Sequence, residues 1–304
     1  MTAALLIVGS EVLSGSVTDA NTPWLARSLT ARGVDLARVC VVPDDTADIA
    51  ATARDLRARH PCVFVAGGIG PTADDVTYEA IARAFDLELA LHEPTVARMR
   101  PHYASRGVEL NDARLRMATL PLYRRGKQGG AATPELVPPP EAEVLFTEGL
   151  WVPLVKVAGT AEFGPVVDAP PASSSSASSG VYVLPGIPRL FQAMFSAHAD
   201  SRFRGPLAET VDLFSSAGEG DVADPLRRVA EQFPSVAVGS YVDVSDLAGG
   251  LPSLLGGAGG GSGARARVRL SFTSRDAEAL RAAVEAARGV VPGLCEAPPP
   301  SAGA

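Results

Sequence analysis

The chain has 304 residues and a formal charge of −7, from 27 Lys and Arg against 34 Asp and Glu. Its length predicts two domains, at roughly 150 residues per domain, and its 46% hydrophobic content excludes a wholly disordered chain. An acidic surface repels a phosphate backbone, so we expect no nucleic-acid partner. The sequence holds no apolar run of the ~18 residues that a membrane span needs, so we expect a cytoplasmic protein with no membrane partner.

The first half of the chain alternates strand and helix patterns. Apolar runs predict strands, because strands of a parallel sheet are covered on both faces, at Leu5–Val8, Val34–Val42 and Val63–Ala66. Apolar residues at helical spacing predict helices over Thr22–Arg32, Thr46–Arg59 and Val76–Phe85. This order predicts an α/β fold with a doubly wound, mostly parallel sheet.

The rest of the chain predicts a second, smaller domain. Residues 1–200 are expected to form the α/β domain, interrupted by flexible insertions at about 122–149, rich in Gly, Pro and charge, and about 158–180, which holds a serine tract. A strand-helix-strand-strand-helix order predicts a small α+β domain over 207–290. Residues 291–304 are expected to be a disordered tail.

The strongest functional pattern follows the third predicted strand. Gly67, Gly68 and Gly70 let backbone N–H groups point into one concavity, and the next helix adds partial positive charge at its start. This predicts a phosphate-binding loop. Asp74 and Asp75 would repel a phosphate unless a divalent cation lay between them, so the pair indicates a cation site. The alternative is a glycine turn followed by an aspartate that caps the helix.

The string Gly67–Glu79, which reads Gly-Gly-Ile-Gly-Pro-Thr-Ala-Asp-Asp-Val-Thr-Tyr-Glu, resembles the signature of the MoaB/Mog molybdopterin-binding domain superfamily. Further blocks resemble the superfamily in the same order: Glu11 to Asn21, Val42–Asp45 and Leu184–Pro188. Within it, the chain is most similar to the molybdopterin-binding-like domain of eukaryotic FAD synthase, and next to the N-terminal half of CinA proteins. Ser10 departs from the pattern, which has an aspartate there, so one carboxylate near the expected site is absent.

The resemblance implies a nucleotide-handling site. Asp75 and Asp74 are the expected catalytic residues, and Asp75, Asp74 and Glu11 the expected ligands of Mg²⁺, Mn²⁺ or Co²⁺. The residues expected to contact the nucleotide are Gly67, Gly68, Gly70, Pro71, Thr72, Thr77, Glu79, Asn21, Asp45, Pro185, Gly186 and Pro188. Asn21 and Asp45 have an equally good alternative as caps of the helices they precede.

The resemblance also implies an activity, the metal-dependent hydrolysis of FAD or ADP-ribose to AMP. Two alternatives stay open: molybdopterin binding with adenylyl transfer in molybdenum-cofactor biosynthesis, and a non-catalytic regulator that binds a flavin or nucleotide. The sequence lacks the adenylyltransferase domain of FAD synthase, so we expect no complete FAD synthase. Because relatives commonly form trimers or dimers, a homo-oligomer is expected.

Overall fold

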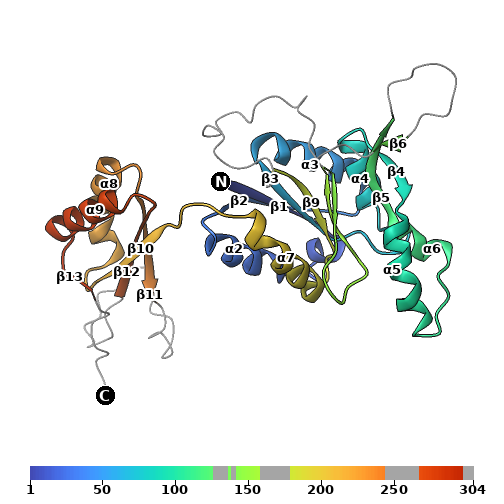
Figure 1. Cartoon of the computed structure of the whole chain (residues 1–304). Helices are drawn as coiled ribbons and strands as arrows, with labels where there is room; N and C mark the ends of the chain where they lie inside the picture. Colours follow the sequence, from blue (N-terminus) through green and yellow to red (C-terminus); the bar gives the residue numbers. More distant parts are fainter. Residues whose placement is uncertain (126–135, 138–141, 158–178, 244–266, 297–304) are drawn as a thin grey trace. The chain divides into compact units, whose positions relative to one another are not determined.

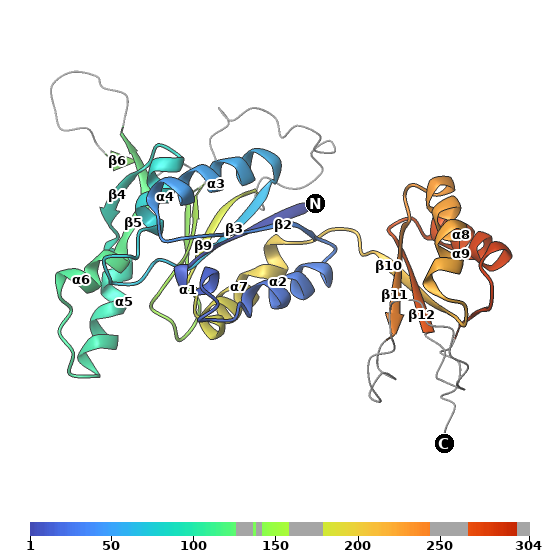
Figure 2. The ribbon, with the colours of Figure 1, turned by 180° about the vertical axis from the view of Figure 1, so that it is seen from behind.

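The computed structural model describes residues 1–125, 136–137, 142–157, 179–243 and 267–296. The chain divides into two compact units, Met1–Gly205 and Pro206–Ala304, and their elements are labelled in Figure 1 and seen from behind in Figure 2. Among the described helices, none combines the length and the apolar character of a membrane span.

The first unit is built on a six-stranded sheet in the order β2-β1-β3-β9-β8-β7. Its parallel strands are β1 (Thr2–Val8), β2 (Asp35–Val42), β3 (Cys62–Ala66) and β9 (Gly180–Leu184). Two antiparallel strands, β8 (Leu154–Val157) and β7 (Glu143–Leu145), complete it. The expected doubly wound, mostly parallel sheet is confirmed. Because the chain leaves β1 for β2 and then returns to β3, the point where the winding reverses lies between β1 and β3.

Helices cover both faces of this sheet, as Figures 1 and 2 show. One face carries α2 (Asn21–Thr30) and α7 (Pro188–Arg202), and the other carries α3 (Thr46–Arg59) and α4 (Thr77–Ala84). Every residue of β3 and β9 is therefore buried. This double covering is why these strands read as continuous apolar runs in the sequence.

An excursion between α4 and β7 adds a three-stranded sheet in the order β4-β5-β6. Its elements are β4 (Glu88–Leu91), α5 (Glu93–Ala104), α6 (Asp112–Leu115), the 3₁₀ turn η1 (Arg116–Ala118), β5 (Thr119–Arg125) and β6 (Leu136–Val137). A four-residue helix, α1 (Ser10–Leu13), follows β1. The excursion brings α5 and η1 beside the ends of the main strands, where they help to line the cavity described below.

The expected flexible insertion at 122–149 is wrong where the structure describes it. Leu122 is buried in β5, and β7 forms the edge of the main sheet. The strand is stable there because Val144 and Leu145 pack against the core while Glu143 pairs with Lys156 and Arg202. Residues 126–135 and 138–141 of this insertion, and 158–178 of the second one, lie outside the described residues.

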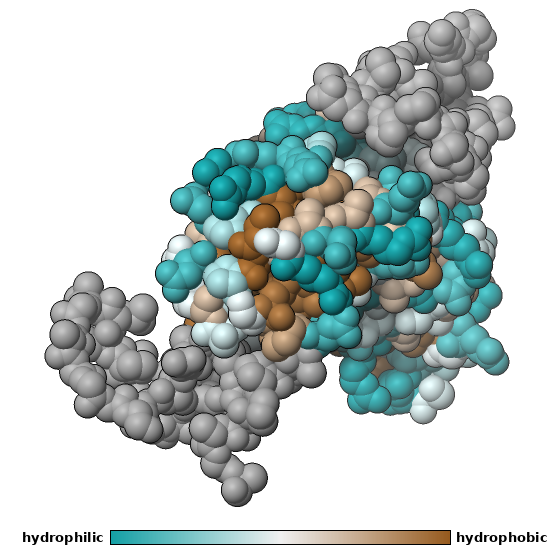
Figure 3. Space-filling model, turned by 90° about the vertical axis from the view of Figure 1, so that its left-hand side faces the viewer, coloured by the Kyte–Doolittle hydropathy of each residue, from teal (hydrophilic) through white to brown (hydrophobic). Residues whose placement is uncertain are grey.

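The second unit is an antiparallel sheet in the order β11-β12-β10-β13, with two helices packed on it. Its elements are β10 (Glu209–Ser215), α8 (Glu219–Gln232), β11 (Ala237–Asp243), β12 (Arg267–Ser274), α9 (Ala277–Val290) and β13 (Leu294–Cys295). This is the split βαβ arrangement of ferredoxin-like folds. The face of the molecule that is drawn in Figure 3 carries an apolar stretch, which hydrophilic side chains border.

The expected disordered tail at 291–304 is wrong for its first residues. Val291 is buried in the core of the second unit, and β13 pairs with the edge strand β10. The sequence gives little sign of this because a two-residue strand carries no periodic pattern. Residues 297–304 lie outside the described part of the chain.

Candidate functional site

A cavity of about 880 Å³ lies at the carboxyl ends of β1, β3 and β9 in the first unit. Its volume is near the upper end of the 300–1,000 Å³ range of small-molecule sites. Open α/β sheets bind ligands at this edge, where the winding reverses. The predicted residues that line it are Glu11, Asn21, Gly67, Gly68, Gly70, Pro71, Asp74, Asp75, Pro185, Gly186 and Pro188.

The glycine loop is held tightly between the ends of the strands. Gly67 has a φ of 107°, and a side chain there would collide with the carbonyl of Val8. Its N–H donates to the Leu184 carbonyl at 3.1 Å. Thr77 is fully buried beneath the loop, where its Oγ1 donates to the Gly67 carbonyl at 2.9 Å and its N–H donates to that of Gly68. Thr77 thus supports the loop from below and does not line the cavity.

Asp75 lies against the same loop. Its Oδ2 accepts hydrogen bonds from the N–H of Thr72 at 2.9 Å and from Thr72 Oγ1 at 2.5 Å. A Cβ at Gly70 would lie 2.5 Å from this oxygen, so the absence of a side chain makes room for the carboxylate. A hydrogen bond from Thr72 also lowers the pKa of the neighbouring Asp74, which is therefore ionised at neutral pH. Thr72 itself orients the Asp75 carboxylate and does not line the cavity.

Arg116, which the sequence analysis did not single out, ties this loop to η1. Its Nη1 donates to the Thr72 carbonyl at 3.0 Å, and its Nη2 donates to the Asp75 carbonyl at 3.2 Å and to Glu79 Oε1 at 3.1 Å. Glu79, expected to contact the nucleotide, instead pairs with Arg116 and lines a small cavity of about 60 Å³ behind the loop. No sequence signal links residues about forty positions apart on unrelated elements.

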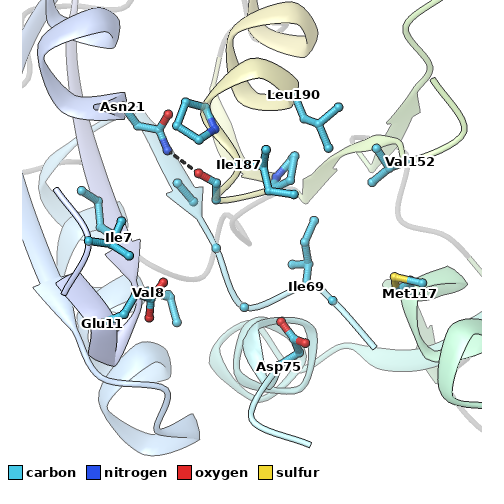
Figure 4. A pocket seen from close by; sticks show the side chains of 18 of the residues that line it. Ile7, Val8, Glu11, Asn21, Ile69, Asp75, Met117, Val152, Ile187 and Leu190 are labelled. Carbon is cyan, nitrogen blue, oxygen red and sulfur yellow. Dashed lines mark hydrogen bonds between the residues drawn. The ribbon is translucent and has the colours of Figure 1, made fainter. Parts of the chain in front are cut away.

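The cavity extends to either side of the glycine loop, as Figure 4 shows by the opposite positions of Ile7 and Met117. We call one side the acidic lobe; it is lined by Ile7, Val8, Glu11, Val12, Val17, Asp19, Asn21 and Asp44. We call the other the aromatic lobe; it is lined by His102, Arg106, Met117, Trp151 and Val152. Ile69 and Ile187 lie between the two. The loop therefore occupies the middle of an elongated site.

Asn21 is the buried polar residue of the acidic lobe. Its Nδ2 donates to the Gly186 carbonyl at 2.8 Å, the dashed line in Figure 4. Its Oδ1 is buried and has no hydrogen-bond partner among the described residues. The helix that it begins is supported instead by Asp19, whose Oδ1 accepts from the N–H groups of Asn21 and Thr22. Asn21 thus ties the start of α2 to the loop after β9, which forms part of the cavity wall.

Asp44 and Asp45 have different roles. Asp45 does not line the cavity, because its Oδ1 accepts hydrogen bonds from Ala47 N and Asp48 N and caps α3. Asp44 lines the acidic lobe, and its Oδ2 accepts from the N–H and the Oγ of Ser10 at 2.9 and 2.8 Å. Asp44, and not the predicted Asp45, is therefore the aspartate of this pair that faces the cavity. Ser10, the departure from the superfamily pattern, serves to orient that carboxylate.

The expected cation ligands are not assembled as a set of three. Figure 4 shows the Glu11 carboxylate apart from that of Asp75, across the loop. Within the described residues, no three His, Cys, Asp or Glu side chains are grouped so that they could hold a metal ion. Asp74 and Asp75 still fit a Mg²⁺-type cation, which is bound in proteins by one or two carboxylates together with substrate phosphates and water. Glu11 belongs instead to the acidic lobe.

Comparison with known proteins agrees with this architecture. The family model described as "Probable molybdopterin binding domain" matches residues 4–204, and that described as "FAD synthase, middle domain" matches 208–295. A protein of Pyrobaculum calidifontis is 33% identical over 245 residues, which cover 79% of this chain and 80% of that protein. A CinA-like protein of Geobacter metallireducens is 36% identical over 154 residues, 51% of this chain and 34% of that protein.

Among solved structures, CinA from Thermoplasma acidophilum shares the fold, with a TM-score of 0.50, 24% identity, and coverage of 66% of this chain and 98% of that one. The chain belongs to the family described as "Probable molybdopterin binding domain", whose model matches about two thirds of it. Its second unit matches the middle domain of FAD synthase. The resemblance found in the sequence is thereby confirmed.

Proposed function

We propose that this protein is a divalent-cation-dependent pyrophosphatase that hydrolyses an adenine dinucleotide, FAD or ADP-ribose, to AMP. The observation that carries the proposal is the elongated cavity with a glycine loop at its middle and a lobe on either side. A dinucleotide has the same layout, with a pyrophosphate between two larger groups. The match of 208–295 to the middle domain of FAD synthase favours the flavin dinucleotide.

The pyrophosphate would lie over residues 67–70. Backbone N–H groups of such a loop, with the start of α4 behind them, bind anions without a cationic side chain. Gly186 also lets the loop after β9 approach closely, since a Cβ there would lie 3.2 Å from Gly67 Cα. In this proposal Gly67, Gly68 and Gly70 contact the phosphates, and Pro185, Gly186 and Pro188 close the opposite wall.

A cation is required because the cavity wall is acidic. Arg106 is the arginine that lines the cavity. Five carboxylates line it as well, those of Glu11, Asp19, Asp44, Asp74 and Asp75. A pyrophosphate would be repelled by this wall unless its charge were offset. Asp75 and Asp74 would hold Mg²⁺, Mn²⁺ or Co²⁺ together with phosphate oxygens. When bound, the cation would offset the charge that develops on the phosphate oxygens during hydrolysis.

The reaction itself would need one water and one acceptor for its proton. The oxygen of water forms a bond to the adenylyl phosphorus while the bond from that phosphorus to the bridging oxygen breaks, giving AMP and FMN, or AMP and ribose 5-phosphate. Asp74 is exposed, next to the loop and ionised at neutral pH, so it is placed to take the proton from water. The bridging oxygen leaves as part of the second phosphate.

A second ligand class is favoured by one observation, the family match over residues 4–204. Molybdopterin would bind in the same cavity, with its phosphate on the glycine loop and its ring in one lobe. Adenylyl transfer to it would use the same loop and the same carboxylates. We also propose that the protein forms a homo-oligomer, as the resemblance to the family implies.

The test is a product assay on the purified protein. FAD and ADP-ribose are incubated separately with Mg²⁺, Mn²⁺ or Co²⁺, and AMP is followed by chromatography, with molybdopterin plus ATP as a parallel reaction. We expect AMP from FAD or ADP-ribose, lost with a chelator and in Asp75→Asn. Asp55→Asn on α3, which changes an exposed carboxylate paired with Arg59, is the matched control and should leave the rate unchanged.

AMP formation that is equal in Asp75→Asn and in the unsubstituted protein would contradict the proposal. Absence of AMP from FAD and ADP-ribose with every cation, together with adenylylation of molybdopterin, would replace it by the second ligand class. Binding of FAD without turnover would identify a regulator that has kept the cavity and lost the chemistry.

A further inference from the structure

The aromatic lobe has a composition that the phosphate chemistry does not require. The ring centroid of Trp151 lies 5.8 Å from that of His102 and 5.9 Å from that of Tyr103, and these two rings are 5.3 Å apart. Met117 belongs to the small hydrophobic cluster against which Trp151 packs. Trp151, His102 and Met117 all line the cavity. Aromatic and thioether side chains together form a wall suited to the face of a planar ring.

The charged group of the aromatic lobe, the guanidinium of Arg106, is a hydrogen-bond donor. Arg106 Nη1 lies 2.9 Å from the ring nitrogens of His102 and donates to its carbonyl at 3.1 Å. The Nε and Nη2 groups of Arg106 make no hydrogen bond to any described residue. Partial burial and the nearby Arg106 lower the pKa of His102, so the imidazole is neutral at neutral pH. A guanidinium has five N–H groups and accepts nothing, so the lobe selects a ligand edge that carries acceptors.

The acidic lobe has the opposite character. The carboxylates of Glu11, Asp19 and Asp44 line it, and carboxylate oxygens accept hydrogen bonds. A ligand group that carries hydrogen-bond donors therefore matches this lobe. Ribose hydroxyls and the amino group of adenine are such donors.

We propose that the aromatic lobe is a specificity site for a fused pyrimidinone ring, the ring system that flavins and pterins share, stacked on Trp151 with its carbonyl oxygens turned toward Arg106. The adenylyl half then occupies the acidic lobe. This inference rests on the proposed function, because it assigns the two halves of the proposed ligand to the two lobes. With this assignment the site selects ligands that carry an aromatic ring system at both ends. FAD therefore binds more tightly than ADP-ribose, whose second end is a ribose.

Tryptophan fluorescence tests the assignment without any turnover. The chain has two tryptophans, and Trp24 packs edge-on against Phe191 and Phe195 in the core. In Trp24→Phe, Trp151 is therefore the single reporter. The probes are FMN, 6-hydroxymethylpterin and AMP, each titrated in chelator, with N-acetyltryptophanamide giving the inner-filter correction. We expect saturable quenching by a pyrimidinone probe and none by AMP.

Each outcome decides a point. Quenching by FMN alone assigns the lobe to a flavin, and quenching by the pterin alone assigns it to a pterin; both support the inference. Saturable quenching by AMP that competes with the other probes overturns it, because the adenine would then occupy the lobe. No quenching by FMN or the pterin also overturns it.

Arg106→Ala should weaken binding of the quenching probe about tenfold, because a hydrogen bond to a charged donor is lost. Arg100→Ala is the control, since Arg100 lies on α5 just before Arg106 in the chain, is exposed and does not line the cavity. Failure of this inference and failure of the proposed function are distinguishable. AMP production without probe binding at Trp151 overturns the inference alone, whereas probe binding without AMP production overturns the proposed activity alone.

Discussion

Arg116 and Glu79 form an ion pair of 3.1 Å in which the guanidinium also holds two backbone carbonyls of the loop that carries Asp74 and Asp75. Both side chains are partly exposed, at 38% and 41%, so the ion pair by itself adds little to stability. Its importance is positional. One side chain fixes the backbone on either side of the two carboxylates that we propose as cation ligands.

Arg116→Ala should therefore weaken cation binding more than it weakens the fold. Loss of a group that orients metal ligands commonly costs about 10–100-fold in metal affinity, and we expect a similar rise in the Mn²⁺ concentration that half-saturates AMP formation. Arg116→Lys should recover little, because an ammonium group cannot span three acceptors in one plane. The measurement is a Mn²⁺ titration of the reaction.

Arg83→Ala, an exposed arginine on α4, is the control and should leave the Mn²⁺ titration unchanged. Thermal unfolding of each variant separates the two effects. A fall in melting temperature with an unaltered Mn²⁺ requirement would show that Arg116 is merely structural.

Two glycines of the loop should respond differently to alanine. At Gly70 the new Cβ meets the carboxylate of Asp75, a flexible group that can move away, so Gly70→Ala should fold normally and lose cation-dependent turnover. At Gly67 the Cβ meets the Val8 carbonyl in a backbone with φ of 107°, so Gly67→Ala should be destabilised by about 2 kcal/mol. Urea unfolding and the AMP assay measure both properties in each variant.

Gly220→Ala provides the control for this pair, since a Cβ there meets nothing within 4 Å. It should retain full activity and lose no stability. Equal losses of stability at Gly70 and Gly67, or full activity of Gly70→Ala, would refute the account of the loop given above.

Neighbouring aspartates on the loop after β2 should separate stability from activity. Asp45→Ala removes the cap of α3 and should cost about 1 kcal/mol in the free energy of unfolding, with the affinity for the nucleotide unchanged. Asp44→Ala removes an acceptor from the acidic lobe and should raise KM for the dinucleotide while stability changes little. Unfolding curves and KM values for both variants give the comparison, and the reverse assignment of effects would contradict it.

These cases show which parts of the site the sequence could predict. Buried parallel strands and the glycine loop carry strong local patterns, because continuous apolar runs and closely spaced glycines each have one main structural use. No such pattern distinguishes Asp44 from Asp45, because they are two consecutive aspartates after the same strand. Only the path of the folded backbone places Asp45 at the start of α3 and Asp44 in the acidic lobe.

The remaining features depend on contacts between distant residues. Arg116 reaches the loop from a 3₁₀ turn, and Trp151 joins the aromatic lobe from the segment before β8. The edge strand β7 was not predicted because a three-residue strand that begins with a charged residue has no clear alternation. Its glutamate is explained by partners that only the fold brings near, Lys156 and Arg202.

That glutamate should make the first unit sensitive to acid. Glu143 lies 2.7 Å from both Lys156 Nζ and Arg202 Nη2, and Lys156 is only 2% exposed. Burial opposes ionisation, but hydrogen bonds from Arg202 and Lys156 outweigh it and hold the pKa of Glu143 below its usual value. A carboxyl with a lowered pKa in the folded state stabilises the protein above its unfolded pKa of about 4.3, and this stabilisation is lost as the pH falls through the lowered value.

Glu143→Gln should therefore be destabilised near pH 7, by about 2 kcal/mol, less than the 3–5 kcal/mol of a fully buried pair because Glu143 is 33% exposed. The difference from the unsubstituted protein should shrink toward zero at acid pH, where that carboxyl is protonated in both states. Urea unfolding followed by tryptophan fluorescence reports this unit, which contains Trp24 and Trp151. Asp55→Asn, which breaks an exposed pair, should cost less than about 0.5 kcal/mol at either pH. A loss in Glu143→Gln that is the same at both pH values would show that shape, and not charge, holds β7 in place.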